Sequence, residues 1–211
     1  MATAVLKKQT RRFGPESNGI LMTPAEFDRA EFVEGWRYEL INGVLIVSPP
    51  PLDNEVDPNE ELCYLLRGYQ ENHPQGSALD VTLGEREVRT GQNRRRADRV
   101  IWAGLGRLPR RREKPTIIVE FVSEGKRNWK RDYETKRDEY KALGVKEYWV
   151  IDRFRRTMTV WRDQPEGPAE RVVAEAEVYR TELLPGFELP LARLLAVADA
   201  WRRQKRKRKP R

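Results

Sequence analysis

Histidine and cysteine are almost absent from this 211-residue chain, which contains one of each, His73 and Cys63. A single cysteine excludes an intramolecular disulfide and a zinc site built from cysteines, and a single histidine argues against a Ser/His/Asp triad or a histidine-rich metal centre. Both residues fall on or just after a predicted helix at residues 57–72, where we interpret them as packing or surface residues.

Long apolar runs are missing as well. The first residues, MATAVLKKQTRRF, lack the continuous apolar region of a signal peptide, and no run approaches the ~18 residues that a membrane span needs. We therefore expect a cytoplasmic protein without membrane contact. Six Trp, seven Tyr and six Phe supply core material, so a chain that is 35% charged is still predicted to fold, most simply as one domain.

The net charge of +8 is confined to the end of the chain. Residues 202–211, RRQKRKRKPR, contain eight Lys or Arg and no acid, so the 33 other basic residues balance the 33 acidic ones. Such a run is typical of a disordered tail that touches phosphate groups without reading sequence, although a solubilising end is the alternative. We predict a flexible basic arm at residues 1–21, a folded domain at 22–201 and a basic disordered tail at 202–211.

Local patterns predict the order of elements. Thr23, Pro24 and Glu26 form a capping box that predicts a helix at residues 24–33. Asn42-Gly43 predicts a tight hairpin within residues 37–47. The other predicted elements are a helix at 57–72, two strands joined by the turn at residues 90–93, strands at 100–102, 147–152, 157–161 and 171–179, and a helix at 191–203.

The most informative stretch begins at residue 115. Its first part, IIVEFV, is the short apolar run of a strand buried on both faces, with Glu120 in its middle. A carboxylate in that position is costly unless it is paired or bound to a metal. Glu120 is therefore a candidate site residue.

The second part of this stretch predicts a helix with a lysine on its apolar face. The residues that recur at helical spacing are Trp129, Tyr133, Lys136, Tyr140 and Leu143, and Gly144 follows at the position of a C-cap. Charges on the other faces already provide solubility, so Lys136 on this face needs another explanation. A strand with Glu120 and a helix that aims Lys136 inward suggest an active site, and a buried salt bridge without chemistry is the alternative.

Other polar residues are candidates on weaker grounds. Asp98 precedes a short apolar strand and can be a turn residue or a metal ligand. Glu39 lies on the first hairpin, opposite in face to Tyr38 and Leu40, where periodicity alone favours a solvent-facing residue. Two arginine clusters and the tail supply candidate nucleic-acid contacts, namely Arg94, Arg95, Arg96, Arg110, Arg111, Arg112, Arg206, Lys207, Arg208 and Lys209.

The order of the segments resembles a known family. YELINGVLIVSPPP, an Asp that opens a strand, IIVEFVS, RDYETKRDEYKALGVKEYWVID and LLPGFEL follow one another over about residues 22–197. In that order they resemble the Uma family of restriction endonucleases, within the PD-(D/E)XK phosphodiesterase superfamily. The resemblance implies an α/β (α+β) fold, a restriction-endonuclease-like central mixed sheet flanked by helices, with a divalent-metal site where Asp and Glu of neighbouring strands converge.

Residue by residue, the resemblance assigns Asp98 as the motif aspartate and Glu120 as the motif (D/E) residue. The superfamily lysine usually stands two residues after the glutamate, but that position is Val122 here. The matching lysine is therefore Lys136, on the following helix. Ala97 stands where a proline usually precedes the aspartate, which alters backbone stiffness and removes no ligand.

The implied site suits Mg²⁺ or Mn²⁺, because Mg²⁺ prefers oxygen ligands and keeps several waters. Asp98, Glu120 and the backbone carbonyl of Phe121 would hold the ion. Lys136 would orient the attacking water and stabilise charge on the phosphate. Glu39 matches an acidic position of the family's first hairpin and would be an additional ligand or general base.

The expected function is metal-dependent hydrolysis of DNA phosphodiester bonds, without an organic cofactor. DNA is the expected partner, and a homodimer is left open. One alternative is a non-catalytic nucleic-acid-binding protein that keeps the nuclease fold. Another is a partner-binding protein that uses the tail only as a targeting signal.

Overall fold

The computed structural model describes residues 12–125, 129–164 and 169–207, and of residues 202–207 it describes the backbone alone. The chain divides into two compact units. The first falls within Met1–Pro50 and Gly91–Arg96, and the second within Pro51–Thr90 and Ala97–Arg211. The prediction of one domain at residues 22–201 did not anticipate this division. No described helix is both long and apolar enough to cross a membrane.

The first unit is built around a hairpin. Strands β3 (Arg37–Ile41) and β4 (Val44–Ser48) are antiparallel, and Asn42 and Gly43 at their turn have φ angles of 51° and 76°. Positive φ at both positions is the signature of a type I′ turn, so the hairpin predicted from Asn-Gly is confirmed. The first residues of β6 add a third strand, with Leu40 paired to Arg94.

The predicted helix at residues 24–33 is wrong beyond its first turn. The capping box is present, but α1 is only Pro24–Phe27, and β2 (Glu31–Phe32) follows it. Aromatic packing explains the change, because the Phe32 ring stacks on Tyr38 with 4.3 Å between centroids and lies 5.0 Å from Phe27. The capping signal fixed where the helix begins, and the tertiary contacts of Phe32 determine where it ends.

The arm predicted at residues 1–21 is shorter than expected. β1 (Arg12–Phe13) pairs in parallel with β2, and the 3-10 turn η1 covers Pro15–Ser17. Phe13 joins the aromatic cluster of this unit, at 6.3 Å from the Phe32 ring. Residues 1–11 lie outside the described residues, so the prediction for them stays a prediction.

The second unit contains most of a large mixed sheet. Its strands follow the order β10-β9-β8-β7-β6, and β5 also pairs with β6. β7 and β8 are parallel, whereas β6 with β7, β8 with β9 and β9 with β10 are antiparallel. The strands are β5 (Leu79–Thr90), β6 (Asn93–Ala103), β7 (Ile117–Phe121), β8 (Glu147–Asp152), β9 (Thr157–Arg162) and β10 (Ala169–Ala174). The α/β (α+β) class with a central mixed sheet is confirmed.

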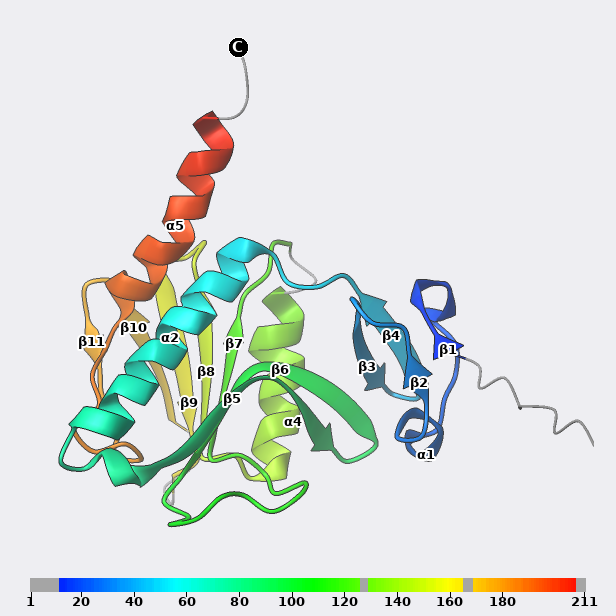
Figure 1. The fold of residues 1–211 in the computed structure, drawn as a ribbon, viewed down its shortest axis with the longest axis horizontal. Coiled ribbons are helices and arrows are strands. Elements are labelled where there is room, and N and C mark those ends of the chain that lie inside the picture. The colour runs from blue at the N-terminus through cyan, green and yellow to red at the C-terminus, as the bar shows by residue number, and fades with distance from the viewer. Residues whose placement is uncertain (1–11, 126–128, 165–168, 208–211) are drawn as a thin grey trace, which may run out of the picture. The chain divides into compact units, whose positions relative to one another are not determined.

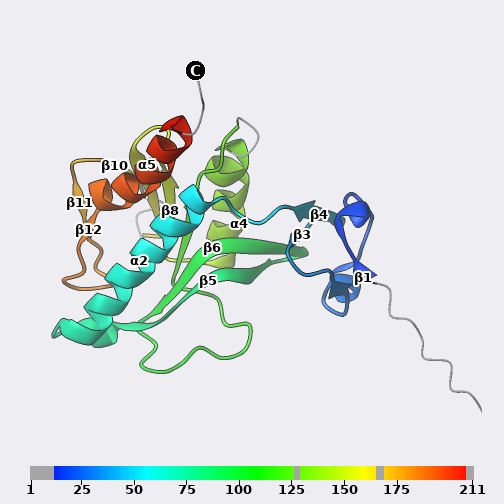
Figure 2. The same cartoon turned by 45° about the horizontal axis from the view of Figure 1, so that its top comes forward.

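Helices cover both faces of this sheet (Figures 1 and 2). On one face, α2 (Asp53–Asn72) and α5 (Leu191–Lys207) pack over a core that includes Ile117 and Val119 of β7. On the other face, α4 (Lys136–Leu143) packs over a core that includes Ile118. Every residue of β7 is buried, as predicted for a strand covered on both faces.

The remaining elements are short. They are η2 (Gly76–Ala78) and the antiparallel pair β11 (Val178–Tyr179) and β12 (Leu189–Pro190). α2 begins four residues earlier than predicted, and the strand predicted at 171–179 is divided between β10 and β11. α5 continues to Lys207, past its predicted end at 203, so the prediction of a disordered tail is wrong for residues 202–207. Residues 208–211 of that tail lie outside the described residues.

Candidate active site

Asp98 and Glu120 lie on neighbouring strands of the second unit. β6 and β7 are antiparallel, with Arg99 paired to Val119 and Val100 paired to Ile118. Continuing this register places Asp98 opposite Glu120, with both side chains on one face of the sheet. The backbone N–H of Phe121 also donates to Asp98 Oδ2 at 2.8 Å. The structure therefore brings these two predicted residues together.

Lys136 reaches the same cluster from the helix that covers this face. Its Nζ lies 2.8 Å from Glu120 Oε2 and 3.4 Å from Asp132 Oδ1. The residues Glu120 and Lys136 are each 2% exposed, and Asp132 is 1% exposed. One buried ammonium group therefore pairs with two buried carboxylates.

A π-helical turn directs these side chains inward. The turn, η3 (Arg131–Thr135), precedes α4, and the backbone N–H of Lys136 donates to the carbonyl of Arg131, five residues back. Single π turns inside helices occur frequently at functional sites. The helix predicted from the aromatic spacing is confirmed, and so is its C-cap at Gly144, where φ is 77°.

Sequence reasoning missed two polar partners in this cluster. Asp132 was not considered, and Tyr140 was interpreted only as an apolar residue, although its hydroxyl donates to Glu120 Oε1 at 2.9 Å. The hydroxyl of Tyr148, on β8, donates to the backbone carbonyl of Asp132 at 2.9 Å. A signal was present, because Asp132, Lys136 and Tyr140 recur at intervals of four, the spacing that aligns side chains on one face of a helix.

Buried negative charge exceeds buried positive charge in this cluster. Burial raises the pKa of Glu120 to about 8, Lys136 opposes the rise, and Asp98 and Asp132 add to it. Burial also raises the pKa of Tyr148 well above its ordinary value, and the nearby Glu120 and Asp132 raise it further. Within the described part of the chain, Asp132 Oδ2 is buried without a hydrogen-bond partner. The cluster can therefore accept a further proton or cation.

The oxygen donors of the cluster have the chemistry that Mg²⁺ prefers. Asp98 and Glu120 supply two carboxylates in register, next to the backbone of Phe121. Among the residues that the structure describes, no group of three or more His, Cys, Asp or Glu side chains is arranged to hold a metal ion. The oxygen atoms of Asp98, Glu120 and the Phe121 backbone suit a hard cation such as Mg²⁺. The side-chain ligands would be two carboxylates rather than three.

Glu39 belongs to the first unit, which is described separately from the Asp98 cluster. The favoured interpretation of Glu39 as solvent-facing is wrong, because its residue exposure is only 8%. β3 lies between β4 and the start of β6, and Glu39 Oε1 accepts a hydrogen bond from the backbone N–H of Arg96 at 3.0 Å. This contact explains its burial within the first unit.

The predicted nucleic-acid contacts lie in different environments. Arg94 donates to both carboxylate oxygens of Asp28, at 2.8 and 3.1 Å, and Arg95 is 1% exposed. The Arg94 guanidinium is thus paired inside the first unit and Arg95 is buried, so neither side chain is exposed for phosphate contact. Arg96 is half-buried, and the residues of the second cluster, Arg110, Arg111 and Arg112, are exposed. The side chains of Arg206, Lys207, Arg208 and Lys209 lie outside the described residues.

The single histidine and cysteine have the environments expected of packing residues. His73 ends α2, and its ring stacks on Tyr69 with 5.1 Å between ring centroids. Cys63 is a free, half-buried thiol on α2. The candidate site contains neither residue.

Comparison with known proteins agrees with this architecture. A family model described as "Uma2: Putative restriction endonuclease" matches residues 24–192. Among solved structures, the chain is similar to "a putative nuclease belonging to DUF820 from Anabaena variabilis ATCC 29413", with a TM-score of 0.65 and 17% identity over 84% of this chain and 99% of that chain. A search of curated proteins found no match. The chain therefore belongs to the Uma2 family of restriction endonuclease-like proteins and has the fold of a nuclease.

Proposed function

We propose that this protein is a Mg²⁺- or Mn²⁺-dependent endonuclease that hydrolyses phosphodiester bonds of DNA at the cluster of Asp98, Glu120 and Lys136. The position of Lys136 is the observation that carries this proposal. Its ammonium group is buried 2.8 Å from Glu120, on the sheet face where Asp98 is in register with Glu120. The family and the nuclease-like fold support the same reaction class.

Each residue has a role that follows from its chemistry. Asp98, Glu120 and the carbonyl of Phe121 would hold the cation, which when bound lowers the pKa of water and polarises a phosphate oxygen. Lys136 would orient the attacking water and offset charge that develops on the phosphate. Tyr140 would keep the Glu120 carboxylate oriented through its 2.9 Å hydrogen bond.

Nicking of supercoiled plasmid DNA tests this proposal. The wild-type protein is incubated with Mg²⁺, with Mn²⁺ or with EDTA, and Glu120→Gln is assayed in parallel. We expect nicking by the wild type that requires the cation and is lost in Glu120→Gln, because the substitution replaces a charged ligand with a neutral amide. Nicking in EDTA, or equal nicking by the variant, would refute the role of this cluster.

A second candidate function is nucleic-acid binding without catalysis. It is favoured by the closed contact between Glu120 and Lys136, two side chains only 2% and 3% exposed, which would serve equally as a structural ion pair. In that case the wild-type protein binds DNA and never nicks it with either cation. The plasmid assay combined with a DNA-binding assay separates the two functions.

A further inference from the structure

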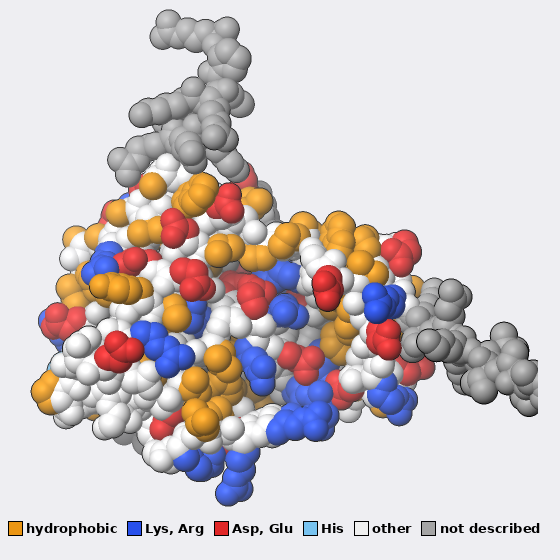
Figure 3. All heavy atoms as spheres, in the orientation of Figure 1, with side chains coloured by type: hydrophobic (Ala, Val, Ile, Leu, Met, Phe, Trp, Pro, Cys, Tyr) orange, Lys and Arg blue, Asp and Glu red, His pale blue; other side chains and the backbone are white. Residues whose placement is uncertain are grey.

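A cavity of about 460 Å³ in the second unit has six basic residues in its lining and two acidic ones. It lies between β5, the end of β6 and the loop at residues 104–116 that leads into β7. Its basic lining residues are Arg86, Arg89, Arg110, Arg111, Arg112 and Lys114. Figure 3 shows Lys and Arg side chains along the lower edge of the molecule, where Figure 1 shows this loop.

Four of the six positive charges of this cavity have no ion-pair partner among the described residues. In the described part of the chain, no hydrogen bond or ion pair engages the side chains of Arg86, Arg111, Arg112 and Lys114. The two acidic lining residues are already engaged, since Glu87 accepts from Arg89 at 3.1 Å and Glu113 pairs with Arg107 at 2.8 Å. The cavity therefore presents a concave surface with excess positive charge.

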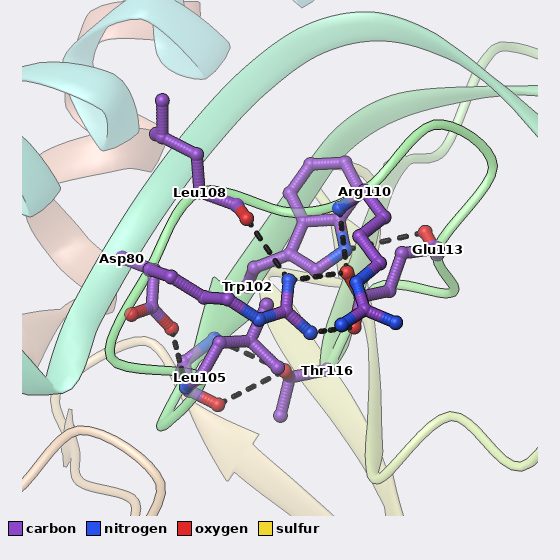
Figure 4. A network of polar contacts seen from close by, with 9 residues as sticks. Asp80, Trp102, Leu105, Leu108, Arg110, Glu113 and Thr116 are labelled. Carbon is purple, nitrogen blue, oxygen red and sulfur yellow. Dashed lines mark hydrogen bonds and ion pairs between the residues drawn. The ribbon is translucent and has the colours of Figure 1, made fainter.

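The loop that supplies most of these cations is held in place by its own polar contacts (Figure 4). Arg107 donates to both carboxylate oxygens of Glu113, each at 2.8 Å, and the backbone N–H of Arg110 donates to Glu113 Oε2 at 2.6 Å. The base of the loop is fixed where Trp102 Nε1 donates to the Glu113 carbonyl at 3.2 Å. Leu105 N–H donates to Asp80 at 2.7 Å. A fixed loop loses little conformational freedom on binding, which favours affinity.

The cavity lies on the same sheet face as the candidate active site. Val100 and Trp102 line it, and they follow Asp98 at intervals of two along β6, so the three side chains point to one face. Four residues of a strand span about 13 Å. A DNA strand that reaches the candidate active site could therefore also place backbone phosphates at the cavity.

A second cavity in this unit, of about 270 Å³, provides a contrast. Its lining includes Arg137 and Arg162, but Arg137 contacts Asp138 at 2.8 Å and Arg162 contacts Glu147 at 3.0 Å. Three acidic residues also line it, namely Asp138, Asp163 and Glu170. Its charges are therefore balanced, and it offers no comparable reason for anion binding.

We propose that the cation-lined cavity binds backbone phosphates of the DNA substrate next to the bond that is cleaved. The inference rests on the proposed function for the identity of the polymer. Arg86 from β5 and Arg111 from the loop contribute charges from different sides of the cavity. The interaction is independent of sequence, since phosphates carry no base information.

The salt dependence of DNA binding tests the inference. A fluorescein-labelled 20-base-pair duplex is titrated with full-length protein in EDTA, so that cleavage does not interfere, over a series of salt concentrations. Arg86→Ala/Arg111→Ala is compared with wild type. The matched control is Arg171→Ala/Arg180→Ala, which removes two exposed arginines outside the cavity that pair with Glu177 and Glu188. Thermal melting establishes that each variant is folded, and Arg111→Ala alone replaces the double variant if it is not.

We expect the slope of log affinity against log salt to become shallower by about 1.8 in the cavity variant, or about 0.9 in the single variant, because each phosphate that is no longer neutralised changes the slope by about 0.9. The control should keep the wild-type slope. Equal slopes for the cavity variant and wild type would overturn the inference, as would a larger change on single-stranded RNA than on the duplex. If these slopes are found and the wild type nicks no plasmid, the proposed function fails while the phosphate site stands.

Discussion

Lys136 is the residue on which the candidate site depends most. Its ammonium group contacts both Glu120 and Asp132, and both carboxylates are buried. Removing a buried charge partner is costly because the remaining charge cannot regain its hydration. Lys136 therefore contributes to the stability of the fold as well as to the proposed catalysis.

Lys136→Met is expected to lower the free energy of unfolding by up to about 3–5 kcal/mol at pH 9, above the Glu120 pKa of about 8, because it breaks a buried ion pair there. Met suits the aromatic face of the helix, so the fold should persist. The loss should be smaller at pH 5, because Glu120 then takes up a proton and no longer needs a cation. Urea denaturation at pH 9 and pH 5 measures this, and a variant as stable as wild type at pH 9 would contradict the buried pair.

The raised pKa of Glu120 also predicts how wild-type stability depends on pH. The pKa rises from 4.5 to about 8 on folding, mainly through burial, so the folded protein binds more protons than the unfolded chain between these values. This contribution to stability is fully present below pH 4.5 and is lost as the pH rises through about 8. Melting temperatures from pH 5 to 9 should fall more in wild type than in Glu120→Gln, which does not titrate. If the melting temperatures of the two proteins fall equally with pH, a group other than Glu120 determines the pH dependence of stability.

At the scale of elements, the sequence predicts most where the signal is local. Asn42-Gly43 predicts the hairpin, and the apolar run around Glu120 predicts β7. The π turn at Arg131–Thr135 escaped prediction because aromatic spacing of 4 and 3 fits an ordinary helix equally well. The early end of α1 was not predicted either, because the packing of Phe32 on Tyr38 is a tertiary contact without a local signal in the sequence.

The C-cap of α4 provides a prediction at this scale. Gly144 has φ of 77°, and a Cβ added there would lie 2.8 Å from Lys114 Nζ. We expect Gly144→Ala to cost about 1–2 kcal/mol, the usual penalty of the left-handed conformation for a residue with a Cβ, since the lysine can move aside. The control is Gly68→Ala in the interior of α2, where nothing lies within 4 Å and Ala should stabilise by about 0.5–1 kcal/mol. Urea denaturation compares them, and equal effects would contradict this account.

At the scale of the whole molecule, the sequence predicted the fold class and the residues that meet at the sheet, but not the division into two units. That division depends on which apolar residues share a core. Tyr38, Leu40 and Leu45 form a separate core in the first unit, and their spacing along the chain does not reveal this. The same limit applies to Glu39, whose burial depends on the pairing of β3 with β6.

The net charge of +8 is located entirely in residues 202–211. Deletion of these residues should leave the domain folded, since Trp201 still donates to Asp57 on α2 at 2.7 Å. DNA affinity should fall and its salt slope should become shallower, by up to about 0.9 for each phosphate that the tail neutralises in the full-length protein. Titration of the labelled duplex measures this, and an unchanged slope would leave the tail as a solubilising segment.

The central claim is that DNA is cleaved at the cluster of Asp98, Glu120 and Lys136. The most direct test compares the cleavage per folded molecule of two glutamine variants. Glu120→Gln alters the candidate site, whereas Glu147→Gln alters an equally buried glutamate on β8, 4% exposed, that accepts hydrogen bonds from Trp149, Tyr179 and Thr181. Both variants are assayed on supercoiled plasmid with Mg²⁺ or Mn²⁺, with activity normalised to the folded fraction. The account predicts that only Glu120→Gln loses nicking, and equal activity of the two variants would contradict it.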